Sequence, residues 1–171
     1  MQIAKHLGAG KVIATGRNAE ALRAVEALGA DATVRLVEDD DALEEIFKAQ
    51  FAERVDVVID YLWGRSAERL LIAAAKIGAD AVPIRFVQIG SVSGADITLP
   101  SAVLRASAIE LMGSGLGSIA FDRLTHAIGE LLRATVSAGF TIATHSMPLS
   151  QVAQAWSNKE DSRRTVLTIG L

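Results

Sequence analysis

Short apolar segments alternate with amphipathic segments along the first half of this 171-residue chain. The apolar segments predict strands at residues 12–14, 32–36, 55–60 and 85–91. The segments between them have helical spacing and predict helices at residues 2–7, 19–28, 42–51 and 66–77. Parallel strands need crossover connections, which are usually helices. The alternation therefore predicts an α/β fold with a doubly wound, Rossmann-like parallel sheet.

The pattern changes after residue 94. We expect residues 99–108 to be helical or irregular. Further strands are predicted at residues 109–115, 140–150 and 164–170, and further helices at residues 121–138 and 149–156.

The predicted order of elements begins with a helix, whereas a doubly wound domain begins with a strand. The turn after that first strand carries the glycines that cradle the phosphates of a dinucleotide. Here residues 2–7 read as the end of the helix that should follow this turn. We therefore expect a Rossmann-like fold that lacks its first strand and its glycine-rich turn.

Composition narrows the class of protein. The net charge of −3 argues against a nucleic-acid partner, and the absence of cysteine excludes disulfides and thiolate metal sites within the sequence. No apolar run approaches the roughly 18 residues that a membrane span needs, so no membrane partner is expected. A cytoplasmic protein is the expectation.

The segments "QIAKHLGAGKVIATGRNAEAL", "VDVVID" and "FVQIGS" together resemble the cofactor-binding domain of the medium-chain dehydrogenase/reductase family. The resemblance is strongest to its NADPH-dependent quinone-oxidoreductase-like branch, and that family also includes the zinc-type alcohol dehydrogenases. "MPLSQVAQAW" and "RTVLTIG" are similar to the family's C-terminal ending. The resemblance implies an NADP(H)-binding domain over residues 1–145 and, over residues 146–171, a helix and strand that return to a catalytic domain.

The resemblance also implies an activity. Complete family members are oxidoreductases that transfer hydride between NADPH and a small carbonyl, enone or quinone substrate. They carry a GroES-like catalytic domain ahead of this region, which this sequence does not contain, so we expect a fragment that is inactive alone. The alternative is a non-catalytic nucleotide-binding or dimerisation module. In similar proteins the last strand of the sheet pairs with its copy, which implies a homodimer through residues Ile109–Met112.

Gly16, Arg17 and Asn18 stand at the tip of the strand where NAD-dependent proteins of this fold place an acid. A carboxylate there would repel the additional phosphate of NADPH, whereas Gly16 leaves room for it. Arg17 supplies a charged planar fork suited to a phosphate, and Asn18 can bind the phosphate or cap the following helix. These residues predict an NADPH site. The alternative is that Arg17 is a solvated loop arginine and Gly16 a turn residue.

Two further loops follow predicted strands, where ligands bind in open α/β sheets. Asp60, Tyr61 and Leu62 end one strand, and Ile89, Gly90 and Ser91 end the next. The resemblance implies that the first loop flanks the cofactor and that the second passes near its nicotinamide. The alternatives are an aromatic cover of the strand edge and an ordinary turn.

No residue of the chain is predicted to be catalytic, and no metal ligand is predicted. The three histidines, His6, His126 and His145, lie far apart, and no two of them have metal-ligand spacing on one helix.

Overall fold

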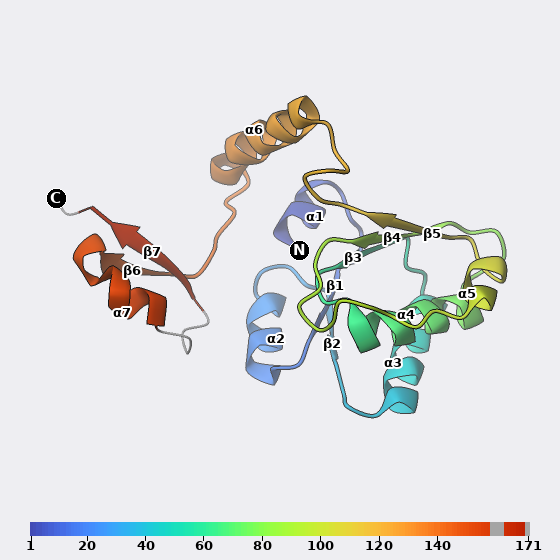
Figure 1. Ribbon diagram of the computed structural model, residues 1–171. Helices are drawn as coiled ribbons and strands as arrows, with labels where there is room; N and C mark the ends of the chain where they lie inside the picture. The colour runs from blue at the N-terminus through green and yellow to red at the C-terminus, as the bar shows by residue number, and fades with distance from the viewer. Residues whose placement is uncertain (158–162, 170–171) are drawn as a thin grey trace. The chain divides into compact units, whose positions relative to one another are not determined.

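The computed structural model describes residues 1–157 and 163–169, which form two compact units, residues 1–126 and 127–171. The elements of the first unit are α1 (Gln2–His6), β1 (Ile13–Gly16), α2 (Ala19–Glu26), β2 (Ala32–Arg35), α3 (Asp40–Ala52), β3 (Val57–Asp60), α4 (Gly64–Ile77), β4 (Ile84–Gln88), α5 (Ser101–Arg105) and β5 (Ile109–Gly113). Helix α6 (Phe121–Ser137) spans the boundary between the units. The second unit continues with β6 (Thr144–Pro148), the 3₁₀ turn η1 (Leu149–Gln151), α7 (Val152–Ser157) and β7 (Arg164–Thr168) (Figure 1).

This order confirms the predicted alternation of strands and helices. Residues 99–108, left open between helix and irregular chain, contain the short helix α5. The predicted last strand is present as β7, and its residue 170 lies outside the described residues.

Every strand pairing in the described residues is parallel, which confirms the α/β class. β1 pairs with β2 in one sheet, β3, β4 and β5 form a second sheet in that order, and β6 pairs with β7 in a third. In the doubly wound strand order 3-2-1-4-5-6, the first strand lies between the second and the fourth. The pair β2–β1 corresponds to strands 3 and 2 of that order, and β3, β4 and β5 correspond to strands 4, 5 and 6.

The edge of β3 that faces away from β4 has no strand partner among the described residues. Its side chains Val57 and Ile59 are 49% and 53% exposed, although the segment is an apolar run. Strands in the middle of a parallel sheet are normally buried on both faces. Val57 and Ile59 lie two residues apart and so share one face of the sheet, which the described residues leave partly uncovered.

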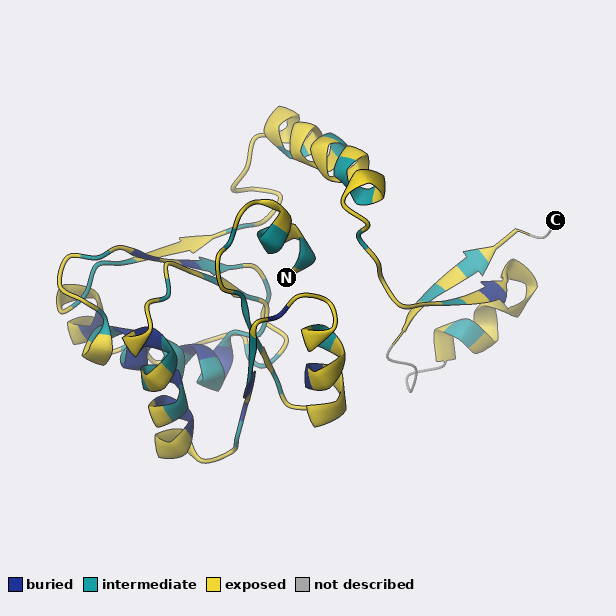
Figure 2. Ribbon diagram, turned by 180° about the vertical axis from the view of Figure 1, so that it is seen from behind, coloured by how far each residue is buried: buried dark blue, intermediate teal, exposed yellow. Residues whose placement is uncertain are grey.

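The core of the first unit lies between the strands and the helix pair α3–α4. Its buried residues come from β2 and the residue after it, α3, α4 and β4, and they are Val34, Leu36, Leu43, Phe47, Phe51, Ala73, Ala74 and Ile84. Figure 2 shows the buried residues concentrated on these two helices and the strands beside them. Ile13 of β1 and Val58 of β3 both pack against this cluster, so the two sheets cover one core.

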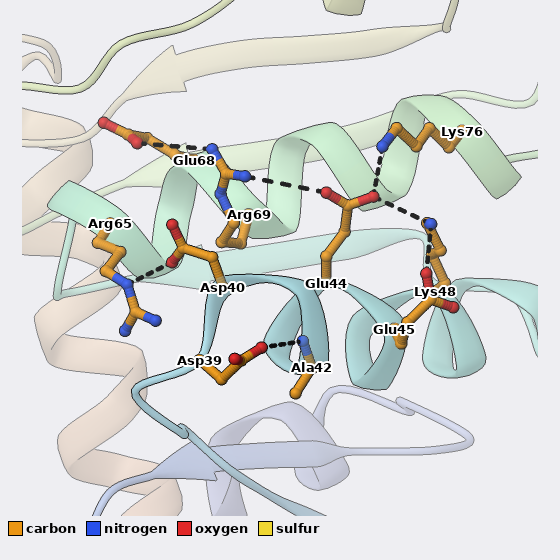
Figure 3. Close-up of polar contacts among 10 residues, drawn as sticks. All are labelled: Asp39, Asp40, Ala42, Glu44, Glu45, Lys48, Arg65, Glu68, Arg69 and Lys76. Carbon is orange, nitrogen blue, oxygen red and sulfur yellow. Dashed lines mark hydrogen bonds and ion pairs between the residues drawn. The ribbon is translucent and has the colours of Figure 1, made fainter.

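A charged network links α3 to α4 on the polar side of this core (Figure 3). The buried carboxylate of Glu44 accepts a hydrogen bond from Lys76, and it lies 3.0 Å from the ammonium of Lys48 and 3.9 Å from the guanidinium of Arg69. The hydrogen bond from Lys76, together with the Lys48 ammonium, holds the pKa of Glu44 below its ordinary value, although burial opposes this. Glu44 is therefore ionised in the folded protein at neutral pH.

Glu44 makes the stability of the first unit depend on pH. Because the folded chain keeps this carboxylate ionised to lower pH than the unfolded chain does, the unfolded state binds more protons below the ordinary pKa of 4.5. The stabilisation is present above that pH and is lost as the pH falls. We expect Glu44→Gln to lower the free energy of unfolding by about 1–2 kcal/mol at pH 7 and to flatten its decline between pH 5 and about 3.

Urea unfolding across this pH range measures the effect. The control is Glu45→Gln, since Glu45 also pairs with Lys48 but its side chain is 69% exposed. Equal pH dependence in the parent and in Glu44→Gln would contradict the assignment.

The second unit contains a parallel strand pair with η1 and α7 in its crossover connection. Met147 of β6 is buried, whereas Trp156 of α7 is largely exposed. No residue of α6 is buried, and Figure 2 shows the helix in the colours of exposed and half-buried residues. No helix in the described part of the chain combines the length and the apolar character that crossing a membrane requires.

Candidate functional site

The predicted cofactor-selecting tip follows β1. Gly16 closes the strand, and its carbonyl accepts a hydrogen bond from the amide of Leu36 at 2.8 Å. A Cβ at Gly16 would lie 3.1 Å from Cδ2 of Leu22, so glycine lets this tip pack closely on α2. Asn18 is the N-cap of α2, because its side-chain oxygen accepts from the amides of Glu20 and Ala21 at 2.8 and 3.0 Å. Of the two roles predicted for Asn18, the structure shows capping.

Arg17 lies exposed between Gly16 and Asn18, and its side chain reaches the loop after β4. Its Nη2 donates a hydrogen bond to Oγ of Ser93 at 2.9 Å. Arg17 takes part in none of the ion pairs found among the described residues. Its positive charge therefore lies at the carboxyl end of the strands without a neutralising carboxylate from the described part of the chain.

Asp60 shapes the loop after β3. Its two carboxylate oxygens accept from the amides of Leu62 and Trp63 at 3.1 and 2.9 Å. These bonds hold a sharp turn in which Trp63 has a φ of 57°, directly before α4 begins. The side chain of Asp60 thus fixes the turn into α4.

The loops after β3 and β4 are hydrogen-bonded to each other. The carbonyl of Asp60 accepts from the amide of Ile89 at 2.7 Å, that of Tyr61 from Val92 at 3.3 Å, and that of Leu62 from Ser93 at 2.8 Å. A Cβ at Gly90 would lie 2.7 Å from the carbonyl oxygen of Tyr61, closer than real Cβ contacts allow. Glycine at position 90 is therefore required by the close approach of the two loops.

The structure brings all three sequence-predicted segments together. Residues 60–62 and 89–91 lie on the two joined loops, and Arg17 reaches the second of them through Ser93. Sequence reasoning missed Ser93. The sequence signal that could have indicated Ser93 is its position two residues after the predicted Ser91, in the segment "GSVSG" that follows a strand.

An open pocket of about 320 Å³ lies at the carboxyl ends of β4 and β5. Its lining residues are Trp63, Gln88, Ala95, Leu111, Met112 and Gly113. Trp63 is fixed on one side by an edge contact with Phe86, at 6.1 Å between ring centroids. The lining combines apolar side chains with the amide of Gln88, whose Nε2 donates to the carbonyl of Gly90 at 3.0 Å. No pocket at this position is predicted from the sequence.

No group of three His, Cys, Asp or Glu side chains within residues 1–157 and 163–169 is placed to hold a metal ion. The sequence also contains no cysteine. The described residues therefore do not assemble the donor set that structural or catalytic zinc requires. A nucleotide phosphate fits better, because the guanidinium of Arg17 forms no ion pair with a described residue and is a suitable donor for it.

Comparison with known proteins gives one curated relative, a probable NADPH-dependent quinone reductase of Emericella nidulans. It is 28% identical over 98% of this chain, and the chain spans about half its length (49%).

Among solved structures, an NAD-dependent alcohol dehydrogenase matches with 26% identity and a TM-score of 0.74, covering 99% of this chain and 46% of the other. A mycobacterial quinone oxidoreductase matches with 21% identity and a TM-score of 0.71, covering 90% of this chain and 46% of the other. These likenesses confirm the Rossmann-like fold.

The family model described as "Zinc-binding dehydrogenase" matches residues 1–133, which is more than three quarters of the chain. The match includes β1 to β5 and every residue of the candidate site. It agrees with the resemblance to medium-chain dehydrogenases/reductases that the sequence shows. The chain belongs to the zinc-binding dehydrogenase family.

Proposed function

We propose that the chain is the cofactor-binding part of an oxidoreductase that transfers hydride between NADPH and a small carbonyl, enone or quinone substrate. The single observation that carries the choice of NADPH is Arg17 at the tip of β1, a guanidinium to which the described part of the chain offers no carboxylate partner. The curated relative, a probable NADPH-dependent quinone reductase, supports this choice, and so does a mycobacterial structure in complex with NADPH that matches with a TM-score of 0.66.

The residues divide the work of holding the cofactor. Gly16 lets the strand tip pack closely on α2, and Arg17 binds the additional phosphate of NADPH by charge-assisted hydrogen bonds. The joined loops that contain residues 60–62 and 89–91 hold the nicotinamide half. When bound, NADPH supplies the hydride, while the protein binds and orients it.

The test replaces Arg17 by alanine and measures the dissociation constants of NADPH and NADH by fluorescence titration. Charge-assisted hydrogen bonds contribute about 1.5–3 kcal/mol, so we expect the NADPH preference of the parent to fall by about 10- to 100-fold in Arg17→Ala. The affinity for NADH should change little. The matched control is Arg23→Ala, which removes an exposed arginine from α2.

Equal affinity of the parent for the two cofactors would refute the proposal. So would an unchanged preference in Arg17→Ala. Binding of NADH in place of NADPH is the alternative, because one of the structural matches is an NAD-dependent alcohol dehydrogenase.

The homodimer expected through residues 109–112 stays a prediction. Among the described residues β5 is an edge strand of its sheet, and its residues Leu111 and Met112 are 40% and 42% exposed. An exposed strand edge of this kind is suited to pairing with a second copy. The expected cytoplasmic location likewise stays a prediction.

A further inference from the structure

The hydrogen bond between Arg17 and Ser93 joins two parts of the fold that are far apart in sequence. Arg17 follows β1, and Ser93 lies 76 residues later in the loop after β4. No backbone ladder joins β1 to β3 or β4. The contact is therefore made by the two side chains, and its geometry depends on where each loop is held.

Ser93 is held firmly from the neighbouring loop. Its amide donates to the carbonyl of Leu62 at 2.8 Å. Its own carbonyl lies against α4, since a Cβ at Gly64 would be 3.1 Å from that oxygen. Ser93 is half-buried, whereas Arg17 is exposed. The backbone of Ser93 is thus held by its neighbours, and the exposed side chain of Arg17 reaches its hydroxyl.

The chemistry of the pair leaves the guanidinium ready for an anion. Ser93 is neutral, so it orients Arg17 without cancelling its charge. A guanidinium has five N–H donors, and the structure shows one of them used by Ser93. A free arginine side chain has many rotamers, and fixing it before the ligand arrives reduces the entropic cost of binding.

We propose that Ser93 is a positioning residue that holds Arg17 for the additional phosphate of NADPH and so strengthens selection of nucleotides that carry this phosphate. This inference rests on the proposed function, because it assigns Ser93 a role through Arg17. Ser93 differs from the predicted Ser91 in this respect, since its side-chain oxygen contacts the selecting guanidinium.

The probes are adenosine 2′,5′-bisphosphate and adenosine 5′-monophosphate, which differ only in the phosphate assigned to Arg17. Isothermal titration calorimetry of the 171-residue chain gives the ratio of their affinities. We expect Ser93→Ala to reduce this ratio about three- to tenfold, as loss of one hydrogen bond would. Binding of the monophosphate should be unchanged.

Three further variants make the result specific. Ser93→Thr keeps the hydroxyl and should restore most of the ratio. Val92→Ala alters an exposed neighbour in the same loop and should leave the ratio at the parent value. Arg17→Ala should abolish the discrimination.

The outcomes separate the two proposals. If Arg17→Ala removes the discrimination and Ser93→Ala leaves it intact, the role of Ser93 is refuted and the proposed function stands. If Ser93→Ala weakens both probes equally, Ser93 is structural and the inference is also refuted. A parent chain that binds both probes equally, or neither of them, refutes the proposed function together with the inference.

Discussion

Replacing Phe86 by alanine should lower the free energy of unfolding by about 3–5 kcal/mol. Phe86 lies in the middle of β4 and is 1% exposed. It belongs to the buried cluster formed with Ala67, Leu71 and Val103, and its ring contacts the edge of Trp63. Truncation removes the transfer free energy of the ring and leaves a cavity between β4 and α4 that the surroundings fill only in part.

Urea unfolding followed by circular dichroism measures this loss. The matched control is Phe121→Ala, because Phe121 at the start of α6 is 78% exposed, and the same truncation there should cost less than about 1 kcal/mol. The tryptophan signal should also change in Phe86→Ala, since Trp63 loses its ring partner. Similar losses in the two variants would show that β4 does not form the interior assigned to it.

Gly90→Ala is expected to destabilise the chain by about 1–3 kcal/mol and to weaken cofactor binding at the same time. The added Cβ would lie 2.7 Å from the carbonyl oxygen of Tyr61. Both atoms belong to the backbone or are rigidly attached to it, so one loop must move away from the other. That movement strains the hydrogen bonds between Asp60 and Ile89 and between Leu62 and Ser93.

The control is Gly115→Ala, because a Cβ at Gly115 meets nothing within 4 Å. It should leave both the unfolding free energy and NADPH binding close to the parent values. Urea unfolding and fluorescence titration on the same preparations separate the two effects. Unchanged stability in Gly90→Ala would mean that the loops are not packed as the structure shows.

The sequence was sufficient to predict which segments are strands and helices, because local signals determine them. Asn18 predicted the start of α2 correctly, and it caps that helix. The start of α3 was predicted at residue 42, yet the helix includes Asp40 and Asp41. Acidic side chains in the first turn favour the helix dipole, and Asp39 supplies the cap.

The end of β4 shows where local reasoning fails. Residues 85–91 read as one strand, but β4 ends at Gln88. The amide of Ile89 continues the hydrogen bonds to β3 at the carbonyl of Asp60, but the amide of Gly90 turns to the same carbonyl, so the chain leaves the pairing with β5 after Gln88. That acceptor lies about 30 positions earlier in the chain, and no pattern within 85–91 reveals it.

The candidate site was predicted in part for the same reason. Its three segments follow strands, and the carboxyl ends of parallel strands meet at one edge of a sheet. The partner of Arg17 and the pocket beside Trp63 depend on side chains brought together by packing. Such contacts have no periodicity in the sequence, so Ser93 and Gln88 could not be assigned from it.

The arrangement of the strands sets where the backbone is best protected from solvent. Among the strands of residues 1–157 and 163–169, β4 is the one with a ladder on both sides. In the strand orders β1-β2 and β3-β4-β5, only β4 lies between two other strands, so β4 is the central strand of the first unit. Opening the backbone there must break two ladders at once, whereas β1, β2, β3 and β5 each lose one.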